Sequence, residues 1–403
     1  MKIQRAYKTE LNPNNKQQTL LLKHACTARF AYNWGLQRKE EVYRMNQLPI
    51  PHIKTPTAID LHRELTILKN TKFSWMYETS KSAPQEALRN LDRAFENFFG
   101  HRAGYPNYKS KKKGIGSFSL TGSLHVFDDS IQLPRLGIVR LKERNYLPKK
   151  AHILSATISW QASRWFVSLN VEEEIEIPKN NGDIVGVDLG IEKLATVSDG
   201  TKFENPKSLS RNKRKLKRAQ REVSRRKKGS NNRKKSVRKL QRIHTEIENI
   251  RKDTIHKITT WLTKNKSTIV IEDLNISGMV KNHNLASAIL DAGMGEFRRQ
   301  LEYKSQWYNS QIVVADRFYP SSKICSACGY VKSELLLSER VFKCERCNSK
   351  VDRDLNASVN LMKLAGSSPE RLNACGEERF MSIDRCASEK QELNAIGIDF
   401  LNG

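Results

Sequence analysis

Hydrophobic positions in the first hundred residues mostly follow a helical period. Residues 3–11 form the exception, because they alternate as a strand does, and an Asn-Pro-Asn break then precedes a helix expected over residues 16–38. Two more helices are predicted over residues 61–68 and 82–99 from their apolar spacing. We interpret the aromatic side chains of these helices as core packing. The N-terminal part is therefore predicted to combine one strand with a group of helices.

The hydrophobic period changes to about two between residues 104 and 171. Short apolar runs are separated there by Gly, Pro and Asp, which predicts strands in a small barrel or sheet. Four lysines stand beside two tyrosines in this segment: Lys109, Lys111, Lys112 and Lys113, with Tyr105 and Tyr108. A solvated loop is the ordinary explanation of such a run. Interleaved basic and aromatic residues also suit a nucleic-acid backbone with stacked bases.

A second set of strands is predicted after a linker at residues 178–183. One apolar run ends at Asp188, and the next strand leads into an Asp-Gly hairpin at residues 199–200, which together predict an antiparallel meander. A later apolar run ends at Glu272, and a further strand is expected over residues 311–315. A carboxylate thus stands at the end of each of two predicted strands.

The densest charge run covers residues 207–242, with eighteen Lys and Arg and one acid, Glu222. Such a block is usually disordered, yet apolar residues recur along it at helical spacing: Leu209, Leu216, Val223, Leu240, Ile243, Ile247 and Ile250. We predict a basic helical hairpin that turns at residues 229–232, with one face packed and the rest facing phosphates. A merely solvated helix pair is the alternative. The candidate nucleic-acid contacts here are Lys213, Arg214, Lys217, Arg218, Arg225, Arg226, Lys227 and Lys228.

Composition narrows the classes of function. The 403 residues allow two or three domains, and 71 Lys+Arg against 43 Asp+Glu give a formal net charge of +28. This charge repels itself unless a polyanion neutralises it, and nucleic acid is the obvious polyanion. Seven cysteines are too few for a disulfide scaffold. With neither a secretory signal after Met1 nor an apolar run of membrane-spanning length, the sequence predicts a soluble intracellular protein in a reducing compartment.

Four cysteines stand in two Cys-x-x-Cys pairs: Cys325, Cys328, Cys344 and Cys347. The fifteen residues between the pairs complete the spacing of a four-thiolate Zn²⁺ site. Gly329 and Asn348 follow the pairs, where a metal knuckle needs a residue that tolerates positive φ. A redox dithiol is the competing interpretation, and two pairs at this spacing disfavour it. The isolated Cys26 is predicted to be a small buried hydrophobe.

Three carboxylates, Asp188, Glu272 and Asp354, suggest a second metal centre. Asp354 belongs to a helix expected to run to Leu364, with Asp352 as its cap. Each acid alone is ordinarily a solvated strand or helix end, but their order describes a ribonuclease-H-like layout. Two Mg²⁺ ions roughly 3.5–4 Å apart would activate water there and stabilise the leaving oxygen of a phosphodiester. Carboxylates suit this hard cation, whereas thiolates do not.

These motifs carry a family resemblance over nearly the whole chain. The sequence segments concerned are 186–190, 271–279, 319–329 and 352–358, joined by 32–34, 104–109 and 295–301. In this combination the chain resembles TnpB, the RNA-guided DNA nuclease of bacterial and archaeal insertion sequences, which is related to type V CRISPR effectors. Two departures are visible: Asn107 stands where the family tends to have a basic residue, and the tail after Gly366, with Cys375 and Cys386, follows no pattern of the family.

The resemblance implies the roles of the acids and cysteines. Asp188, Glu272 and Asp354 would be the RuvC-like catalytic ligands of two Mg²⁺ ions, and the four cysteines would hold one structural Zn²⁺. Asp354 is preferred to Asp352 because the family's acid lies two residues before the Asn, here Asn356. The implied partners are a guide RNA made from the transposon end and double-stranded target DNA with a short adjacent motif. The resemblance implies no membrane partner, and the protein would be cytoplasmic and nucleoid-associated when bound to DNA.

The implied architecture is α/β and multidomain. The N-terminal half would contain a wedge-like β-barrel over residues 1–12 and 104–180 and a helical recognition domain over residues 13–103. The C-terminal half would contain a RuvC-like ribonuclease-H fold over residues 181–321 and 351–365, with the basic hairpin at 207–260. A zinc ribbon over residues 322–350 and a mobile tail over residues 366–403 would complete the chain.

Two other functions fit parts of the pattern. A nuclease-inactive relative would bind DNA under RNA guidance as a transcriptional repressor, but inactivation usually removes one of the acids, and all three are present. A strand-transferring DNA transposase also uses a ribonuclease-H-like fold. Only a transposase would join its own transposon ends to target DNA, so a strand-transfer assay separates it from the nuclease.

Overall fold

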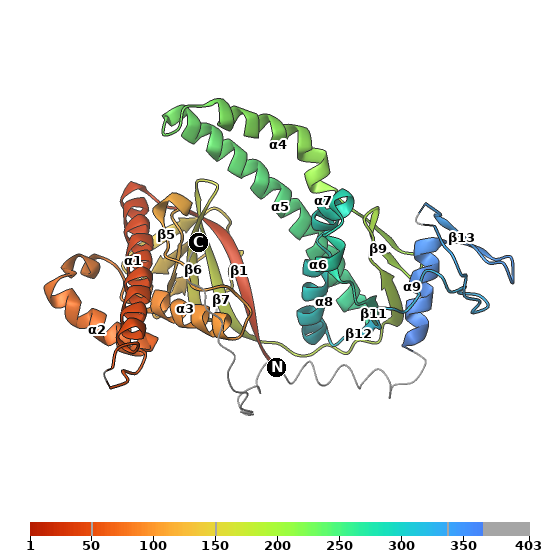
Figure 1. The fold of residues 1–403 in the computed structure, drawn as a ribbon, viewed down its shortest axis with the longest axis horizontal. Coiled ribbons are helices and arrows are strands. Elements are labelled where there is room, and N and C mark those ends of the chain that lie inside the picture. Colours follow the sequence, from red (N-terminus) through yellow and green to blue (C-terminus); the bar gives the residue numbers. More distant parts are fainter. Residues whose placement is uncertain (50, 150, 337, 366–403) are drawn as a thin grey trace. The chain divides into compact units, whose positions relative to one another are not determined.

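The computed structural model describes residues 1–49, 51–149, 151–336 and 338–365. The chain divides into two compact units, Met1–Glu176 with Ala219–Arg242, and Ile177–Arg218 with Ile243–Gly403. Helices and strands are mixed along the chain (Figure 1), so the predicted α/β class is confirmed at this level. The tail predicted to be mobile, with Cys375 and Cys386, lies outside the described residues.

The first unit contains one long strand, a group of helices and then a run of strands, in the predicted order (Figure 1). Its elements are β1 (Lys2–Asn12), α1 (Asn15–Met45), α2 (Ala58–Thr71), the short helix η1 (Ser74–Glu78), α3 (Ser82–Phe99), the short helix η2 (Lys111–Lys113), β2 (Ser117–Leu120), β3 (His125–Val126), β4 (Ser130–Leu133), β5 (Gly137–Leu141), β6 (His152–Gln161) and β7 (Arg164–Glu174). The strands form one antiparallel seven-stranded sheet in the order β2-β6-β7-β1-β5-β4-β3. The prediction of strands from the period of two is confirmed.

Helix α1 begins at a capping box, in which Asn14 accepts from the backbone of Gln17 and the Gln17 side chain accepts from the backbone of Asn14. The helix ends at Met45, later than predicted. The prediction that Cys26 is buried was wrong, because this side chain is exposed and accepts a hydrogen bond from Arg29. The buried face of the helix follows Leu21, His24, Ala25 and Ala28, and position 26 points elsewhere on the helical wheel.

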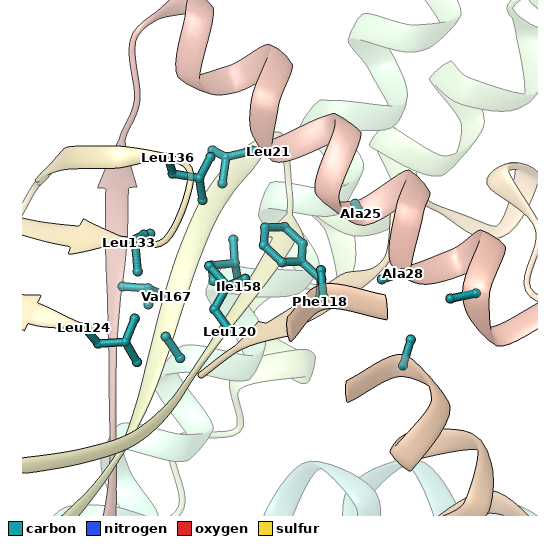
Figure 2. Packing of buried hydrophobic residues seen from close by; sticks show 14 of the residues in the cluster. Leu21, Ala25, Ala28, Phe118, Leu120, Leu124, Leu133, Leu136, Ile158 and Val167 are labelled. Carbon is teal, nitrogen blue, oxygen red and sulfur yellow. The ribbon is translucent and has the colours of Figure 1, made fainter. Parts of the chain in front are cut away.

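The core of this unit lies between its helices and one face of its sheet. Figure 2 shows Leu21, Ala25 and Ala28 of α1 packed toward Phe118 and Leu120 of β2, with side chains of the neighbouring strands around them. The aromatic and aliphatic positions of the predicted helices thus contribute to ordinary core packing. Burial of this apolar surface is the main force that stabilises the unit.

The second unit is built around a mixed five-stranded sheet in the order β10-β9-β8-β11-β12. Its strands are β8 (Asp183–Asp188), β9 (Lys193–Val197), β10 (Lys202–Glu204), β11 (Lys266–Glu272) and β12 (Gln311–Ala315). Strands β8, β9 and β10 pair antiparallel, which confirms the predicted meander, and β11 pairs parallel with both β8 and β12. The carboxyl ends of three parallel strands therefore meet at one edge of the sheet.

Five further helices surround this sheet or extend the chain between its strands: α5 (Asn231–Asn265), α6 (Ile276–Met279), α7 (His283–Ala292), α8 (Met294–Tyr308) and α9 (Arg353–Leu364). The buried side chains of Ile255, Leu262, Phe297 and Leu301 join the sheet in one core. Helix α9 packs on β8, and its Leu361 lies in a second cluster with Val270. The sheet is thus covered by helices drawn from distant parts of the sequence.

The basic segment forms two paired helices, α4 (Ser208–Arg225) and α5 (Figure 1). Leu216, Ile243 and Ile247 of the predicted apolar face are buried, whereas Ile250 is 38% exposed, so the prediction was wrong at that position. Lys215 pairs with Glu246, and Ser236 donates to Glu222. The predicted hairpin is confirmed as a folded helix pair.

A small two-stranded sheet of β13 (Val341–Lys343) and β14 (Lys350–Asp352) follows the first cysteine pair. Phe342 is fully buried beside Cys325 and Cys344, so very little apolar surface accompanies the cysteines. None of the helices in the described ranges combines the length and apolar character needed to cross a membrane.

Candidate active site

Asp188 and Glu272 end two adjacent parallel strands of the second unit. The register pairs Val187 of β8 with Ile271 of β11, so the next residue of each strand lies at the same edge of the sheet. Both side chains are half-buried. The strand alternation that buries Val187 and Ile271 thereby places the two carboxylates side by side at an edge that solvent reaches.

Asp354 reaches the same edge through a close helix-to-strand contact. A Cβ built on Gly186 would lie 2.0 Å from the Ser358 carbonyl oxygen and 2.5 Å from the Met362 amide nitrogen. Only glycine therefore allows α9 to lie directly on β8. Because Asp354 is one helical turn before Ser358, this contact brings its carboxylate toward Asp188.

The pKa of Asp188 is affected by the neighbouring acids. Burial raises the pKa of Asp188 well above its usual range, and the negative charges of Glu272 and Asp354 raise it further, against an opposing effect of Arg353. A carboxyl group in this condition is stabilised in its charged form by a bound cation. The donor set of three carboxylates fits a hard divalent cation such as Mg²⁺.

The three carboxylates are gathered less tightly than the cysteines. Within the described ranges, the four cysteines are the one group of three or more such ligands that converges on a common point, with all ligand atoms within 4.8 Å of one another. The three acids lie at one edge of the sheet, and the charges of Glu272 and Asp354 act on Asp188. Their oxygen atoms do not form so compact a group. A cation would have to draw their oxygens inward.

Glu272 has a neighbour that the sequence patterns did not single out. The hydroxyl of Ser321, a residue only 4% exposed, donates to Glu272 Oε1. The next acid, Asp273, is instead engaged by Arg298 and Arg317, and hydrogen bonding from Arg298 leads the effects that hold the pKa of Asp273 below its usual value. Neighbouring acids at the end of one strand thus have different partners.

Asp352 and Asp354 also have different contacts. The Asp352 side chain accepts from the backbone amides of Asp354 and Leu355, which confirms the predicted cap of the last helix, and it pairs with Lys202 at 2.9 Å. Burial alone would raise the pKa of Asp352, but these hydrogen bonds lower it overall. Asp354 is free of this capping role, and its negative charge raises the pKa of Asp188 more than the charge of Asp352 does.

The four cysteine sulfurs lie close enough together to surround one metal ion. Sγ of Cys325 lies 3.7 Å from Sγ of Cys347, and Sγ of Cys328 lies 3.6 Å from Sγ of Cys344. A Zn–S bond of about 2.3 Å gives tetrahedron edges of about 3.8 Å, whereas a disulfide needs about 2.05 Å. Gly329 and Asn348 have φ values of 76° and 56°, as the knuckle interpretation requires. The sulfurs therefore fit one Zn²⁺.

The first cysteine pair is fastened to helix α9. Nδ2 of Asn356 donates to the carbonyl of Ile324 at 2.6 Å, and Oδ1 of Asn356 accepts from the backbone amide of Ser326 at 2.9 Å. Nδ2 of Asn360 donates to the same Ile324 carbonyl at 2.6 Å. The sequence patterns used Asn356 only as a landmark and did not single out Asn360, although a polar pair spaced by four on one buried helix face was a signal for both.

The candidate nucleic-acid contacts lie on the surface of two segments. All eight basic residues chosen on and after α4 are exposed: Lys213, Arg214, Lys217, Arg218, Arg225, Arg226, Lys227 and Lys228. Lys111 and Lys112 are exposed in a short helical turn, and the side chain of Lys113 lies outside what the structure describes. The Lys109 ammonium lies 3.9 Å from the centre of the Tyr32 ring, and burial lowers its pKa.

Three family models match different parts of this chain. Residues 167–283 match a family described as "Probable transposase", residues 295–361 match the Cas12f1-like TNB domain, and residues 1–47 match a helix-turn-helix domain. In this chain residues 1–47 contain strand β1 and one uninterrupted helix, α1.

Similar proteins cover the chain almost completely. A Streptomyces pristinaespiralis protein named "Putative RNA-guided DNA endonuclease" is 37% identical, over 97% of this chain and 96% of its own length. A protein of Escherichia coli K12 named "Putative RNA-guided DNA endonuclease InsQ" is 34% identical over 94% of this chain and 95% of its own length. TnpB-like proteins of Acanthamoeba polyphaga mimivirus, such as L79, are 27% identical over 32% of this chain and 25% of their own length.

A solved structure supports the fold. In the complex of Cas12f1 with single guide RNA and target DNA, the protein resembles this chain with a TM-score of 0.53 at 12% identity, over 92% of this chain and 99% of that one. The low identity restricts this likeness to the fold. Together with the full-length relatives and the motifs around Asp188, Glu272 and the cysteines, it leads to one assignment: this chain belongs to the TnpB family.

Proposed function

We propose that this protein is an RNA-guided DNA endonuclease that hydrolyses phosphodiester bonds at the edge formed by Asp188, Glu272 and Asp354. The observation that carries the proposal is that Asp188 and Glu272 end two adjacent parallel strands, and that the helix of Asp354 lies directly on the first of these strands. The names of the full-length relatives support the same activity. A carboxylate group at a solvent-accessible sheet edge suits a nucleic-acid backbone better than a small buried substrate.

The three carboxylates would hold Mg²⁺, and two such ions would activate water and neutralise the leaving oxygen of the phosphodiester. The residues of the chain keep the carboxylates in place while the nucleic acid binds. Gly186 lets the helix of Asp354 approach the strand of Asp188, and Asp352 caps that helix. Asp273, held by Arg298 and Arg317, is kept out of the ligand set.

The proposed partners are a guide RNA made from the transposon end and double-stranded target DNA. The exposed basic residues of α4 and the turn after it would neutralise phosphates of the guide or its duplex with the target. Base pairing would then read the sequence, and the protein would read shape, backbone and a short adjacent motif. The Cas12f1 complex, whose fold this chain shares, contains both an RNA and a DNA partner.

We propose domain boundaries from the same structural arrangement and the same relatives. The wedge-like barrel would cover residues 1–12 and 104–180, which belong to the first unit as far as Glu176, and the recognition helices would cover residues 13–103. The second sheet and α9 would form the RuvC-like nuclease, over residues 181–321 and 351–365. Residues 322–350 would be a zinc ribbon whose four thiolates hold one structural Zn²⁺.

Plasmid cleavage with the co-purified RNA tests the proposal. The protein should purify with one dominant structured RNA and cut a plasmid that carries the matching target, in Mg²⁺. Asp188→Ala, Glu272→Ala and Asp354→Ala should each stop cleavage and leave RNA and target binding intact, because the basic surfaces and base pairing provide the affinity. Wild-type protein that binds its target without cutting would establish the repressor alternative, and joining of transposon ends would establish a transposase.

A further inference from the structure

Ser321 connects a proposed metal ligand to the interior of the protein. Its side-chain hydroxyl donates to Oε1 of Glu272, while its backbone carbonyl accepts from Nδ2 of Asn360 at 2.8 Å. Ser321 is 4% exposed and Asn360 is 1% exposed, so water does not compete effectively for these bonds. The residue thus touches the active-site edge with its side chain and helix α9 with its backbone.

The same helix also holds the loop that enters the first cysteine pair. Asn360 and Asn356 both donate to the carbonyl of Ile324, whose oxygen has two lone pairs for them. Lys363 donates to the carbonyl of Ser326, one residue beyond Cys325. The segment from Ser321 to Ser326 is therefore fixed along one face of α9.

This network joins two of the three acids. Ser321 donates to Glu272, and Asp354 lies on α9 itself, six residues before Asn360. A shift of the 321–326 segment relative to α9 would move the hydrogen-bond donor of Glu272 relative to Asp354. The hydrogen-bond donor of Glu272 and the helix that carries Asp354 are thus connected through buried asparagine contacts outside the site.

We propose that Ser321 is a positioning residue for Glu272, and that Asn360 holds Ser321 in place. The hydroxyl fixes one oxygen of the Glu272 carboxylate and leaves the other for the cation. A glutamate has three side-chain torsions, so without this anchor its carboxylate has more orientations available at the half-buried edge. The inference deepens the proposed function and depends on it.

A purely structural role for Ser321 makes a different prediction. If the serine only satisfied a buried hydroxyl, its removal would alter stability and leave the metal dependence of cleavage unchanged. If the serine orients Glu272, its removal should raise the Mg²⁺ concentration that cleavage requires, while the fold, zinc content and target binding stay intact. Removal of a partner that orients a metal ligand typically costs about 10–100-fold in metal affinity or activity.

Three variants of the RNA-bound protein separate these roles. Ser321→Ala removes the hydroxyl, Ser321→Thr retains it, and Ser322→Ala makes the same change at the adjacent, half-buried serine. We expect the Mg²⁺ concentration for half-maximal cleavage to rise about 10–100-fold in Ser321→Ala, to recover largely in Ser321→Thr and to stay unchanged in Ser322→Ala. Zinc content and target affinity should be unchanged in all three.

A direct metal readout complements the cleavage assay. Mn²⁺ binding is measured by water-proton relaxation, with the Asp188→Ala complex as a blank for ions held by nucleic acid alone. The excess binding of wild type over this blank should weaken in Ser321→Ala and return in Ser321→Thr. Ser321→Ala with wild-type metal dependence in both assays would overturn the inference and leave the proposed function standing. Wild type without metal-dependent cleavage would instead overturn the proposed function.

Asn360→Asp tests the second part of the proposal. The substitution keeps the size of the side chain but presents a carboxylate to the carbonyls of Ser321 and Ile324 in place of their donor. We expect it to reproduce the raised metal requirement of Ser321→Ala, with faster hydrogen exchange over residues 321–326. Unchanged metal dependence in a folded, zinc-loaded Asn360→Asp protein would limit the positioning role to Ser321.

Discussion

The cysteine cluster and the carboxylate group bring ligands together by different routes. The four cysteines lie within 23 residues of sequence, and their sulfurs converge through two tight turns with positive φ at Gly329 and Asn348. The acids span residues 188 to 354, and they approach each other only because a five-stranded sheet and α9 have formed. A site made by local turns depends on its own ligands and metal. A site made by tertiary packing depends on every contact that sets the distance between its elements.

The two regions also differ in how they are supported. Beside the cysteines, the described residues provide one fully buried apolar side chain, Phe342, with Tyr330 and Leu335 partly buried against this cluster, so we expect the region to depend on metal binding for its stability. The carboxylate edge rests on the large core around Phe297 and on the layer of Leu361 and Val270. Asn356 and Asn360 of α9 donate hydrogen bonds to the segment before the first cysteine pair, so the cysteine region is attached to the carboxylate region through this helix. We expect loss of the metal at the cysteines to disturb the carboxylate region through this helix.

The largest effect should follow removal of a cysteine ligand. Cys328→Ser leaves three thiolates and removes much of a metal-binding free energy that is on the order of 10–16 kcal/mol in zinc-finger peptides. We expect loss of bound zinc, increased hydrogen exchange over residues 322–350 and strongly reduced cleavage, because the segment before Cys325 then no longer holds Ser321 and α9 firmly. Zinc analysis, hydrogen exchange and plasmid cleavage provide the measurements. Wild-type cleavage by a zinc-free variant would show that the two regions are independent.

A smaller effect, confined to the carboxylate region, is expected from Gly186→Ala. The added Cβ would meet the backbone of Ser358 and Met362 well inside van der Waals contact, so α9 must move away from β8. Overpacking of this kind costs about 1–3 kcal/mol. We expect a lower melting temperature and a large loss of cleavage, with zinc content unchanged. Gly295→Ala in α8 is the matched control, because its Cβ would make only an ordinary 3.4 Å contact with Ile276.

The contrast between local and tertiary assembly also explains what the sequence could predict. The spacing of Cys325 to Cys347 and the positive-φ residues are local, and strands ending at Asp188 and Glu272 follow from apolar runs. Periodicity states which face of an element is buried but not which distant element covers it. The contact between Gly186 and Ser358 and the bond between Ser321 and Glu272 were therefore out of reach.

Helix α7 is another element that periodicity could not supply. Its buried residues, Ile289, Asp291 and Ala292, lie near its end, so no continuous apolar face marks its ten residues. Asp291 is buried because it accepts from Ser208, from the backbone at the start of α4 and from Arg251. The contacts with Ser208 and the backbone at the start of α4 join residues more than eighty positions apart, and they hold the first turn of the basic hairpin in place.

The smallest effect is expected from Asp352→Ala, which tests whether the two aspartates around the start of α9 are separable. The change removes the cap on the amides of Asp354 and Leu355 and the ion pair with Lys202, whose side chain is 37% exposed. Loss of an N-cap costs about 0.5–2 kcal/mol, and an exposed ion pair adds little. We expect a modest decrease in melting temperature and cleavage within a few-fold of wild type.

Asp352→Asn distinguishes the cap from the charge, because an asparagine oxygen caps a helix as well as aspartate does but does not pair with Lys202. This variant should recover most of the stability that Asp352→Ala loses. Asp354→Ala, measured in the same plasmid assay, should show the opposite profile, with stability near that of wild type and no cleavage. If Asp352→Ala abolished cleavage while Asp354→Ala retained it, the third ligand would be Asp352, and the helix cap itself would belong to the metal site.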